Sequence, residues 1–344
     1  MPAYMAKRLS ISAFLEKSKG QCIIDVRSEG EYQISHIHQA INIPLFNNEE
    51  RARVGTTYKQ VGKSEAIIQG LEIVGPKIAP LVLQVKSMAK QPQVFVYCWR
   101  GGMRSGSIAW LLETAGFEVY VLEGGYKAYR RHVIDFLNQM PLQLKVLSGS
   151  TGSGKTEILH LLEKRGEQMI DLEQLAHHKG SAFGALGQEP PPTQEGFESE
   201  LFLLIEKMDL SKPVWIENES KNIGRIYLPK HLFELIQNAP IYFINVPIED
   251  RIQRLLNEYA IFGKDDLAIS VEKIKKRLGG QAYKDCLKAL EENNLKLFTE
   301  LVLFYYDRTY LKHRDKKKNQ VVKEIKISHQ NYEEAIVELL EKEQ

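Results

Sequence analysis

Short apolar runs alternate with amphipathic stretches along the first 140 residues of the chain. The runs at 21–27 (QCIIDVR), 93–98 (QVFVYC) and 119–122 (VYVL) are rich in β-branched and aromatic residues and predict buried strands. Between the last two, residues 105–116 (SGSIAWLLETAG) repeat apolar positions at the helical period and end at a glycine. This order of elements predicts an open α/β sheet.

The same pattern starts a second time after the segment NQMPLQ. The apolar run at 144–149 (LKVLSG) precedes another helical stretch, and beyond about residue 250 the pattern is mostly helical. We therefore expect two α/β domains, residues 1–140 and residues 141–344, the second with a helical, basic C-terminal region. A chain of 344 residues with 43% apolar residues is long enough to build two cores.

Composition indicates the cellular compartment of the protein and excludes some classes of protein. No apolar run approaches the roughly 20 residues that cross a bilayer, and the N-terminal segment lacks the apolar core of a secretion signal. We therefore expect a cytoplasmic protein with no membrane partner. The three cysteines, Cys22, Cys98 and Cys286, form no CxxC pair, so neither a disulfide framework nor a zinc site is expected. The net charge is only +2, but basic residues gather at 273–280 and 312–318.

Cys98 stands between a predicted strand and a predicted helix. Gly101 and Gly102 free the loop backbone to point its N–H groups at an anion, which the helix N-terminus also favours. Arg100 and Arg104 add charge-assisted donors. These surroundings predict a thiolate beside a cradle for an oxyanion or a chalcogen atom, with Cys98, Arg100 and Arg104 as catalytic residues. The alternative is a buried cysteine that only ends a strand.

Residues 149–156 (GSTGSGKT) match the P-loop pattern G-x-x-x-x-G-K-[ST] without departure. A predicted strand precedes the motif and a predicted helix follows it, as phosphate binding requires. Lys155 would reach the phosphate oxygens, and the Thr156 hydroxyl can hold Mg²⁺. The predicted phosphate or diphosphate site consists of Gly149, Gly152, Gly154, Lys155 and Thr156.

Three further residues are candidates for supporting phosphate or Mg²⁺. Glu217 ends the apolar run VWIE, where a carboxylate can orient a magnesium-bound water. Arg251 and Arg254 lie in a segment that resembles the loop and helix after a strand in small P-loop kinases. The alternatives are a structural glutamate and an exposed basic helix face.

Two segments of the first domain, residues 23–44 (IIDVRSEGEYQISHIHQAINIP) and residues 121–129 (VLEGGYKAY), are distinctive. They resemble the segments that open and close a domain of the rhodanese family. The opening segment carries the resemblance at Asp25, Arg27, Glu31, His36, Ile37, Ala40, Asn42 and Pro44. Members of this family carry sulfur or selenium on the loop cysteine, and the resemblance implies this role for Cys98.

The loop from Cys98 to Arg104 departs from the usual rhodanese length. Its form, C-x5-R, is one residue longer than the loop of sulfur-transferring rhodaneses and equal to that of related phosphatases. A loop of this size accepts phosphate, arsenate or a selenium donor. It therefore leaves open whether the chemistry is hydrolysis or chalcogen transfer.

A rhodanese domain followed by a P-loop domain resembles one family, the bacterial tRNA 2-selenouridine synthases, over nearly the whole chain. The more particular stretches are residues 44–62, 97–105, 121–130, 171–184, 216–224 and 274–283. The sequence suggests no mechanism for four residues in or just beyond the stretch 44–62, which are Gly55, Tyr58, Lys59 and Gly70.

The resemblance implies an enzyme that acts on the wobble uridine of tRNAs reading Lys, Glu and Gln codons. Such enzymes convert 2-thiouridine to 2-selenouridine through S-geranyl-2-thiouridine, using geranyl diphosphate and selenophosphate. Cys98 would then hold selenium, with Arg100 and Arg104 at selenophosphate, and the P-loop would bind the prenyl diphosphate with Mg²⁺. No tightly bound metal is expected.

Other features are weaker signals. The residues Lys273, Lys275, Lys276 and Arg277 are a candidate contact for the tRNA backbone. The aromatic residues of this region line a prenyl pocket, stack on bases or pack in the core, and they are Phe298, Phe304, Tyr305, Tyr306 and Tyr310. His177 and His178 lack metal-ligand spacing, and we expect them to be structural or to face RNA.

Two other classes of function stay open on the sequence alone. One is a cysteine phosphatase or sulfurtransferase fused to a nucleotide-binding P-loop module. The other is a P-loop kinase with an inactive rhodanese module as a regulatory binder, which the presence of Cys98 disfavours. These functions differ in whether the P-loop binds ATP or only the prenyl diphosphate.

Overall fold

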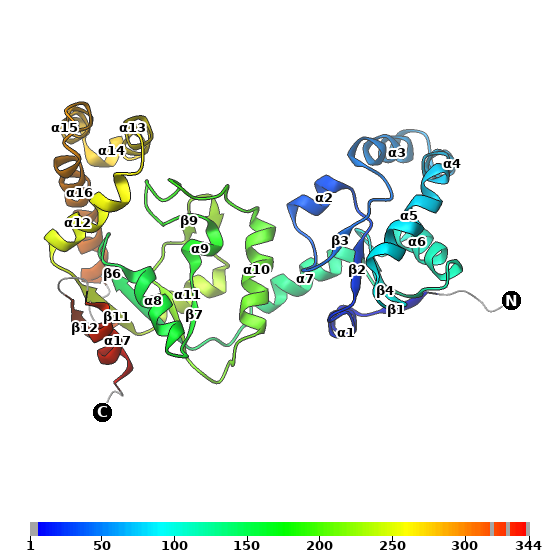
Figure 1. The fold of residues 1–344 in the computed structure, drawn as a ribbon, viewed down its shortest axis with the longest axis horizontal. Coiled ribbons are helices and arrows are strands. Elements are labelled where there is room, and N and C mark those ends of the chain that lie inside the picture. Colours follow the sequence, from blue (N-terminus) through cyan, green and yellow to red (C-terminus); the bar gives the residue numbers. More distant parts are fainter. Residues whose placement is uncertain (1–5, 317–319, 328–330, 342–344) are drawn as a thin grey trace. The chain divides into compact units, whose positions relative to one another are not determined.

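The computed structural model describes residues 6–316, 320–327 and 331–341. The chain divides into two compact units between Phe136 and Leu137, which we call the first and second domains (Figure 1). The sequence placed the boundary at Met140.

The first domain is built on a parallel sheet. Its strands lie in the order β1 (Lys7–Leu9), β5 (Glu118–Leu122), β4 (Gln93–Tyr97), β2 (Cys22–Asp25) and β3 (Ile41–Asn42). The connecting helices are α1 (Ile11–Lys17), α2 (Glu29–Ile34), α3 (Asn48–Gln60), α4 (Lys63–Val74), α5 (Ile78–Met88), α6 (Met103–Thr114) and α7 (Gly125–Leu137). A 3₁₀ turn, Gly75–Lys77, joins α4 to α5.

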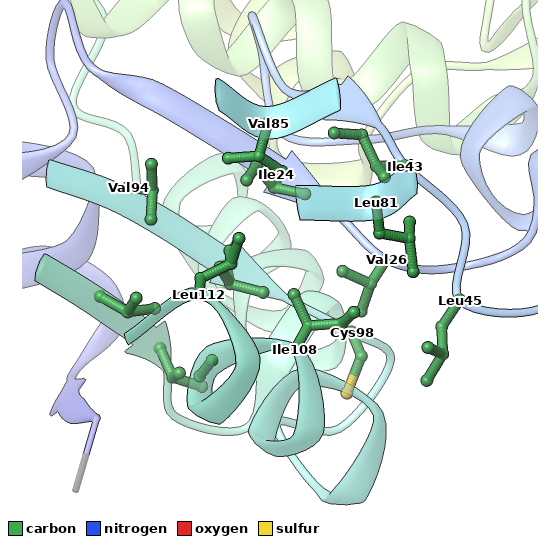
Figure 2. Packing of buried hydrophobic residues seen from close by; sticks show 14 of the residues in the cluster. Ile24, Val26, Ile43, Leu45, Leu81, Val85, Val94, Cys98, Ile108 and Leu112 are labelled. Carbon is green, nitrogen blue, oxygen red and sulfur yellow. The ribbon is translucent and has the colours of Figure 1, made fainter. Parts of the chain in front are cut away.

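Alternation along β4 directs its side chains to two different layers of helices. Val94 and Val96 join a core with residues of α5 and α6, as Figure 2 shows for Val85 and Ile108. On the opposite face, Phe95 makes an edge contact with Phe14 of α1, at 5.4 Å between ring centroids. The sheet is therefore covered on both sides, which is the usual state of an all-parallel sheet.

The second domain repeats this plan. Its parallel sheet has the order β12 (Val321–Lys326), β11 (Ile241–Asn245), β6 (Leu144–Gly149), β8 (Val214–Glu217) and β7 (Gln168–Ile170). Helices α8 (Lys155–Lys164) and α17 (Tyr332–Leu340) pack on one face through Leu159, Leu162 and Ile336. A two-stranded antiparallel ribbon, β9 (Asn222–Ile223) and β10 (Ile226–Tyr227), lies outside this sheet.

The remaining helices connect these strands or form a separate helical cluster. The connecting helices are α9 (Leu172–Ala176), α10 (Gln194–Glu206) and α11 (Lys230–Asn238). The helical cluster consists of α12 (Ile248–Tyr259), α13 (Lys264–Glu272), α14 (Lys275–Leu278), α15 (Gly280–Glu291) and α16 (Leu295–Lys316). Its core includes Leu255, Val271, Cys286 and Phe298, so Cys286 and Phe298 serve packing.

The fold confirms the two α/β sheets and the mostly helical region beyond about residue 250. Within that region, Val321–Lys326 returns to the sheet as its edge strand β12. Ile325 is buried against the core while Lys326 is exposed. A short strand with this alternation is easily overlooked beside long helices, because its pairing partner β11 is distant in sequence.

One helical run in the first domain is apolar. Among the described residues, Lys63–Met88 is long and apolar enough to be a candidate membrane span. The run comprises α4, the 3₁₀ turn and α5, and although Leu81 and Val85 pack on the sheet, only 17% of its most apolar window is buried. A single helix of this kind is weak evidence for a membrane span.

Candidate active sites in the two domains

A buried ion pair at the end of β2 stabilises the first domain near Cys98. Arg27 and Asp25 have no exposed side-chain surface, and Arg27 Nη2 donates to Asp25 Oδ2 at 2.6 Å and to the Ser35 carbonyl at 2.7 Å. The Arg27 guanidinium also lies 3.8 Å from the ring centroid of Tyr126, at the start of α7. The pair therefore ties the end of β2 to α7, a structural role for two of the rhodanese-like positions. Asn42 adds to it by donating to the carbonyls of Asp25 and Arg27.

Cys98 lies at the carboxyl end of β4, in the loop that precedes α6. This loop packs so closely on the turn before α7 that only glycine fits at two places. A Cβ on Gly125, whose φ is +59°, would stand 2.2 Å from the Cys98 carbonyl oxygen, and one on Gly101, at φ +64°, would stand 2.6 Å from the Leu122 carbonyl oxygen. The N–H groups of Tyr126 and Lys127 donate to the carbonyls of Cys98 and Trp99. These contacts fix the path of the loop around the thiol.

The surroundings of the thiol favour the thiolate. Burial raises the pKa of Cys98, but a hydrogen bond from Ser105, the backbone N–H groups of Arg100 and Ser105, and the charge of Arg104 together outweigh it and lower the pKa. The Cys98 Sγ to Ser105 Oγ distance is 3.2 Å. Ser105 was missed in the sequence analysis. The signal was present, since a hydroxyl one residue after the loop arginine lies in the first turn of the helix.

The two loop arginines are placed differently. Arg104 donates to Glu31 Oε2 at 3.0 Å, and Arg51 of α3 lies 3.8 Å from the same oxygen. Arg100 is exposed, and its contribution to the thiol comes through its backbone N–H. Glu31 therefore holds Arg104 beside the thiol and links the thiol loop to α3.

The P-loop, residues 149–156, joins β6 to α8 as the sequence predicted. Gly152 and Gly154 have φ values of +80° and +79°, in the left-handed region that favours glycine. Lys155 Nζ donates to the Gly149 carbonyl at 3.1 Å, and the Thr156 hydroxyl lies 3.4 Å from Glu173 Oε2. The loop thus presents backbone N–H groups, one ammonium and one hydroxyl to a common space, which suits a diphosphate.

The P-loop borders a cavity of about 1150 Å³. Its polar wall includes Asp171, Glu173 and Glu219. Burial and then the neighbouring charge of Glu173 raise the pKa of Glu219 to about 7, and burial raises the pKa of Glu173. The apolar wall includes Phe183, Leu186, Leu255, Tyr259, Phe262 and Tyr306. One cavity therefore combines an anion site with a large apolar surface.

The sequence pattern predicted Glu217 as a support for Mg²⁺ or phosphate and did not predict the carboxylates of this wall. Glu217 is fully buried behind the wall, where its Oε2 accepts from the Leu172 N–H at 3.1 Å and its Oε1 has no hydrogen-bond partner. Burial raises the pKa of Glu217 well above its ordinary value. The role of Glu217 in supporting Mg²⁺ binding stays a prediction. Glu219, two residues beyond the same strand, reaches the cavity instead.

The two arginines of α12 contact the P-loop region in different ways. Arg251 is buried, donates to the Thr151 carbonyl at 3.2 Å and pairs with Asp307 at 2.7 Å. It therefore supports the P-loop backbone. Arg254 lines the cavity and bonds to Glu157 and to the Tyr332 hydroxyl.

The other predicted residues are spread over the second domain. Lys273, Lys275, Lys276 and Arg277 are all exposed around α14, and Lys275 pairs with Glu272. His177 caps α9, and His178 packs against Gly184 and Gly224, so both have structural surroundings. Among the aromatic residues, Tyr305 is buried, Phe304 is exposed, and Tyr306 lines the cavity. The side chain of Tyr310 and those of the basic stretch 312–318 lie outside the described residues.

Removing the Ser105 hydroxyl tests the account of the thiol. In a Cys22→Ala, Cys286→Ala background, Ser105→Ala should move the pH midpoint of thiolate formation at Cys98 upward, because the thiolate loses a donor. The ultraviolet absorbance of the thiolate, followed against pH, measures this midpoint. Ser107→Ala, an exposed change on the same helix, is the control. An unchanged midpoint in Ser105→Ala would contradict the assignment.

Family models of known proteins match both domains. The family model for the tRNA 2-selenouridine synthase AAA domain matches residues 142–343, and the model for the rhodanese-like domain matches residues 10–132. The tRNA 2-selenouridine synthase of Shewanella frigidimarina is 36% identical over 336 residues, covering 87% of this chain and 90% of that protein. The synthase of Nitrosomonas europaea is 32% identical over 340 residues, covering 84% and 88%.

A solved structure resembles part of the chain. It is the N-terminal domain of a protein from Clostridium difficile 630, with 48% identity, a TM-score of 0.34, and coverage of 37% of this chain and 98% of that one. The assignment to a family rests on the relatives matched over most of their length and on the family model for residues 142–343. The chain therefore belongs to the tRNA 2-selenouridine synthase family, with a rhodanese-like domain followed by the family's AAA domain.

Proposed function

We propose that the protein converts 2-thiouridine at the wobble position of tRNAs reading Lys, Glu and Gln codons to 2-selenouridine through S-geranyl-2-thiouridine. The co-substrates are geranyl diphosphate and selenophosphate. The observation that carries the proposal is that one chain holds two anion sites of different chemistry. One is a thiol with a lowered pKa, and the other is a P-loop beside a cavity with an apolar wall.

The second domain is the proposed site of geranyl transfer. The C1–O bond of geranyl diphosphate breaks with its electron pair on the diphosphate, the thiocarbonyl sulfur bonds to C1, and the uridine N3 proton is lost. Lys155 and the loop N–H groups stabilise the charge that develops on the diphosphate. The apolar side chains of the cavity, such as Phe183 and Phe262, suit the prenyl chain.

Mg²⁺ fits this site by the chemistry of its donors. The Thr156 hydroxyl and the carboxylate of Glu173 lie together at the P-loop, and both are hard oxygen ligands of the kind Mg²⁺ prefers. When bound, Mg²⁺ would neutralise charge on the diphosphate leaving group.

The first domain is the proposed site of selenium delivery. Alkylation makes the sulfur at C2 a better leaving group, so hydroselenide can add at C2 and expel geranylthiol. Selenium in selenophosphate is already fully reduced. Making a perselenide on Cys98 from it would remove two electrons, for which the reaction has no acceptor.

Attack by the Cys98 thiolate on phosphorus avoids this electron imbalance. The Sγ–P bond forms, the P–Se bond breaks with its electron pair on selenium, and hydroselenide is released next to the tRNA. Water then hydrolyses the S-phosphocysteine to phosphate. The seven-residue loop from Cys98 to Arg104 is the length found in related phosphatases, which supports phosphorus as the centre attacked.

The direct test is mass analysis of nucleosides from tRNA that carries 2-thiouridine. The tRNA is incubated with the protein, Mg²⁺ and geranyl diphosphate, with and without selenophosphate. A geranylated nucleoside without selenophosphate and 2-selenouridine with it are expected. Unchanged tRNA together with hydrolysis of an aryl phosphate or ATP would favour the phosphatase or kinase reading instead.

Single substitutions should separate the two steps. Cys98→Ala is expected to abolish 2-selenouridine while geranylation stays within about twofold, because the P-loop site is intact. Lys155→Ala should reduce geranylation by about 100-fold, the usual scale for losing one charge-stabilising donor. Nucleoside mass analysis measures both products, with Cys286→Ala as a control for a cysteine in the core. Loss of geranylation in Cys98→Ala would refute the division of labour.

The atom carried by Cys98 distinguishes the two forms of the selenium step. With selenophosphate labelled in phosphorus or in selenium, rapid acid quenching and mass analysis of the peptide containing Cys98 should find the phosphorus label. Cys98→Ser sets the background of unspecific labelling. Selenium on Cys98 without phosphorus would mean that a perselenide forms and that an oxidant takes part.

A further inference from the structure

The hairpin formed by α3 and α4, residues 48–74, buries almost none of its side chains. Helix α3 has no fully buried residue, and α4 fully buries only Ala66 and Gly70, the latter against Phe46, while Val54, Ile73 and Val74 pack partly buried against the core. Figure 1 shows the two helices as a hairpin. Surface helices usually bury an apolar stripe against their own core. Two helices that contribute so little to the core are therefore candidates for contact with another molecule.

From Arg51 onward, the exposed surface of α3 and the following turn is basic. From residue 51 to residue 64 the chain contains Arg51, Arg53, Lys59 and Lys63 and no Asp or Glu. All four basic residues are exposed. Of the two acidic residues at the start of α3, Glu50 caps the helix and pairs with Lys77, while Glu49 is exposed, and Glu65 follows in the first turn of α4. This charge pattern is complementary to a polyanion.

Gly55 lies in the middle of α3, and no contact within the described part of the chain requires a glycine there. A Cβ at this position would meet no atom of the described residues within 4 Å, and the backbone is not in the left-handed region. Glycine weakens a helix interior relative to alanine. A glycine that costs helix stability and relieves no internal contact is explained by the close approach of an external molecule to the helix backbone.

Tyr58 lies on the same side of the helix as Gly55. Arg51, Gly55 and Tyr58 are spaced at i, i+4 and i+7, so they share one face of α3, with Lys59 beside them. The Tyr58 side chain is 57% exposed. An exposed aromatic ring next to basic side chains is the combination that stacks unpaired bases and holds the RNA backbone.

This face begins next to the thiol loop. Arg51 shares the Glu31 carboxylate with Arg104, which lies in the Cys98 loop. From Arg51 to Tyr58 the helix rises about 10 Å, at about 1.5 Å per residue. A nucleic acid with its target base at Cys98 would therefore have its flanking nucleotides within reach of α3.

We propose that the face of α3 formed by Arg51, Gly55, Tyr58 and Lys59 binds the single-stranded anticodon loop of the tRNA beside the reacting uridine. The inference rests on tRNA being the substrate, which belongs to the proposed function. It goes beyond that function by giving the substrate a docking surface in the first domain. It also assigns a role to Gly55, Tyr58 and Lys59.

Binding of 2-thiouridine tRNA to the full chain tests the inference without any selenium or prenyl chemistry. Dissociation constants are measured by filter binding over a series of salt concentrations. The variants are Lys59→Ala, Tyr58→Ala and Gly55→Ala, with Arg53→Ala on the opposite side of α3 as a control for position. Lys86→Ala, an exposed lysine on α5, and Gly75→Ala, a helical glycine with an open Cβ position, are the matched controls.

Lys59→Ala should weaken binding about threefold to tenfold and make its salt dependence shallower, because a phosphate contact is lost, whereas Arg53→Ala should have a smaller effect. Tyr58→Ala should weaken binding about fivefold or more, with the salt dependence kept, because stacking is lost. Gly55→Ala should raise or preserve the melting temperature and still weaken binding. A purely structural glycine would not separate these two readouts.

The inference is overturned if the α3 variants bind tRNA like the controls while the unsubstituted protein binds it tightly. It is also overturned if the same variants change self-association or binding to anionic lipid vesicles and leave tRNA binding unchanged, since a second copy or a membrane would then occupy the face. Failure of the unsubstituted protein to bind tRNA would refute the proposed function itself, and the inference with it.

Discussion

Both candidate sites depend on one constraint, the tight turn between a parallel strand and the helix that follows it. At such a turn the strand end, the helix N-terminus and the loop N–H groups converge on one point. In the first domain the turn after β4 can form only because Gly101 and Gly125 let two loops touch backbone to backbone. In the second domain Gly152 and Gly154 give the P-loop its left-handed positions. The fold thus creates two anion sites before any catalytic side chain is added.

Side chains then make the two sites chemically different. The first site holds a thiol whose pKa is lowered by Ser105, by loop N–H groups and by Arg104, and so it suits a nucleophile. The second has an ammonium, a hydroxyl and carboxylates with raised pKa values beside an apolar cavity. It suits a diphosphate that carries a hydrocarbon chain. In the proposed function, sulfur is alkylated at the second site before selenium displaces it at the first.

Much of this arrangement was predictable from the sequence because its signals are local. The strand before Cys98, the helix after it and the P-loop between β6 and α8 are each encoded in about a dozen consecutive residues. Features that depend on distant pairing were missed. Strand β12 joins β11 across the whole helical cluster, and Glu219 reaches the cavity while the strand-end residue Glu217 turns into the core. The Glu31–Arg104 pair spans 73 positions. No local pattern records such contacts.

The central claim is that the two steps occur at two separate sites in one chain. The most direct measurement gives the Lys155→Ala protein a tRNA that already carries S-geranyl-2-thiouridine, together with selenophosphate, and follows 2-selenouridine by nucleoside mass analysis. The account predicts product at nearly the rate of the unsubstituted protein, because the defective P-loop is bypassed. Absence of product would contradict it, since the P-loop would then be required for the selenium step as well.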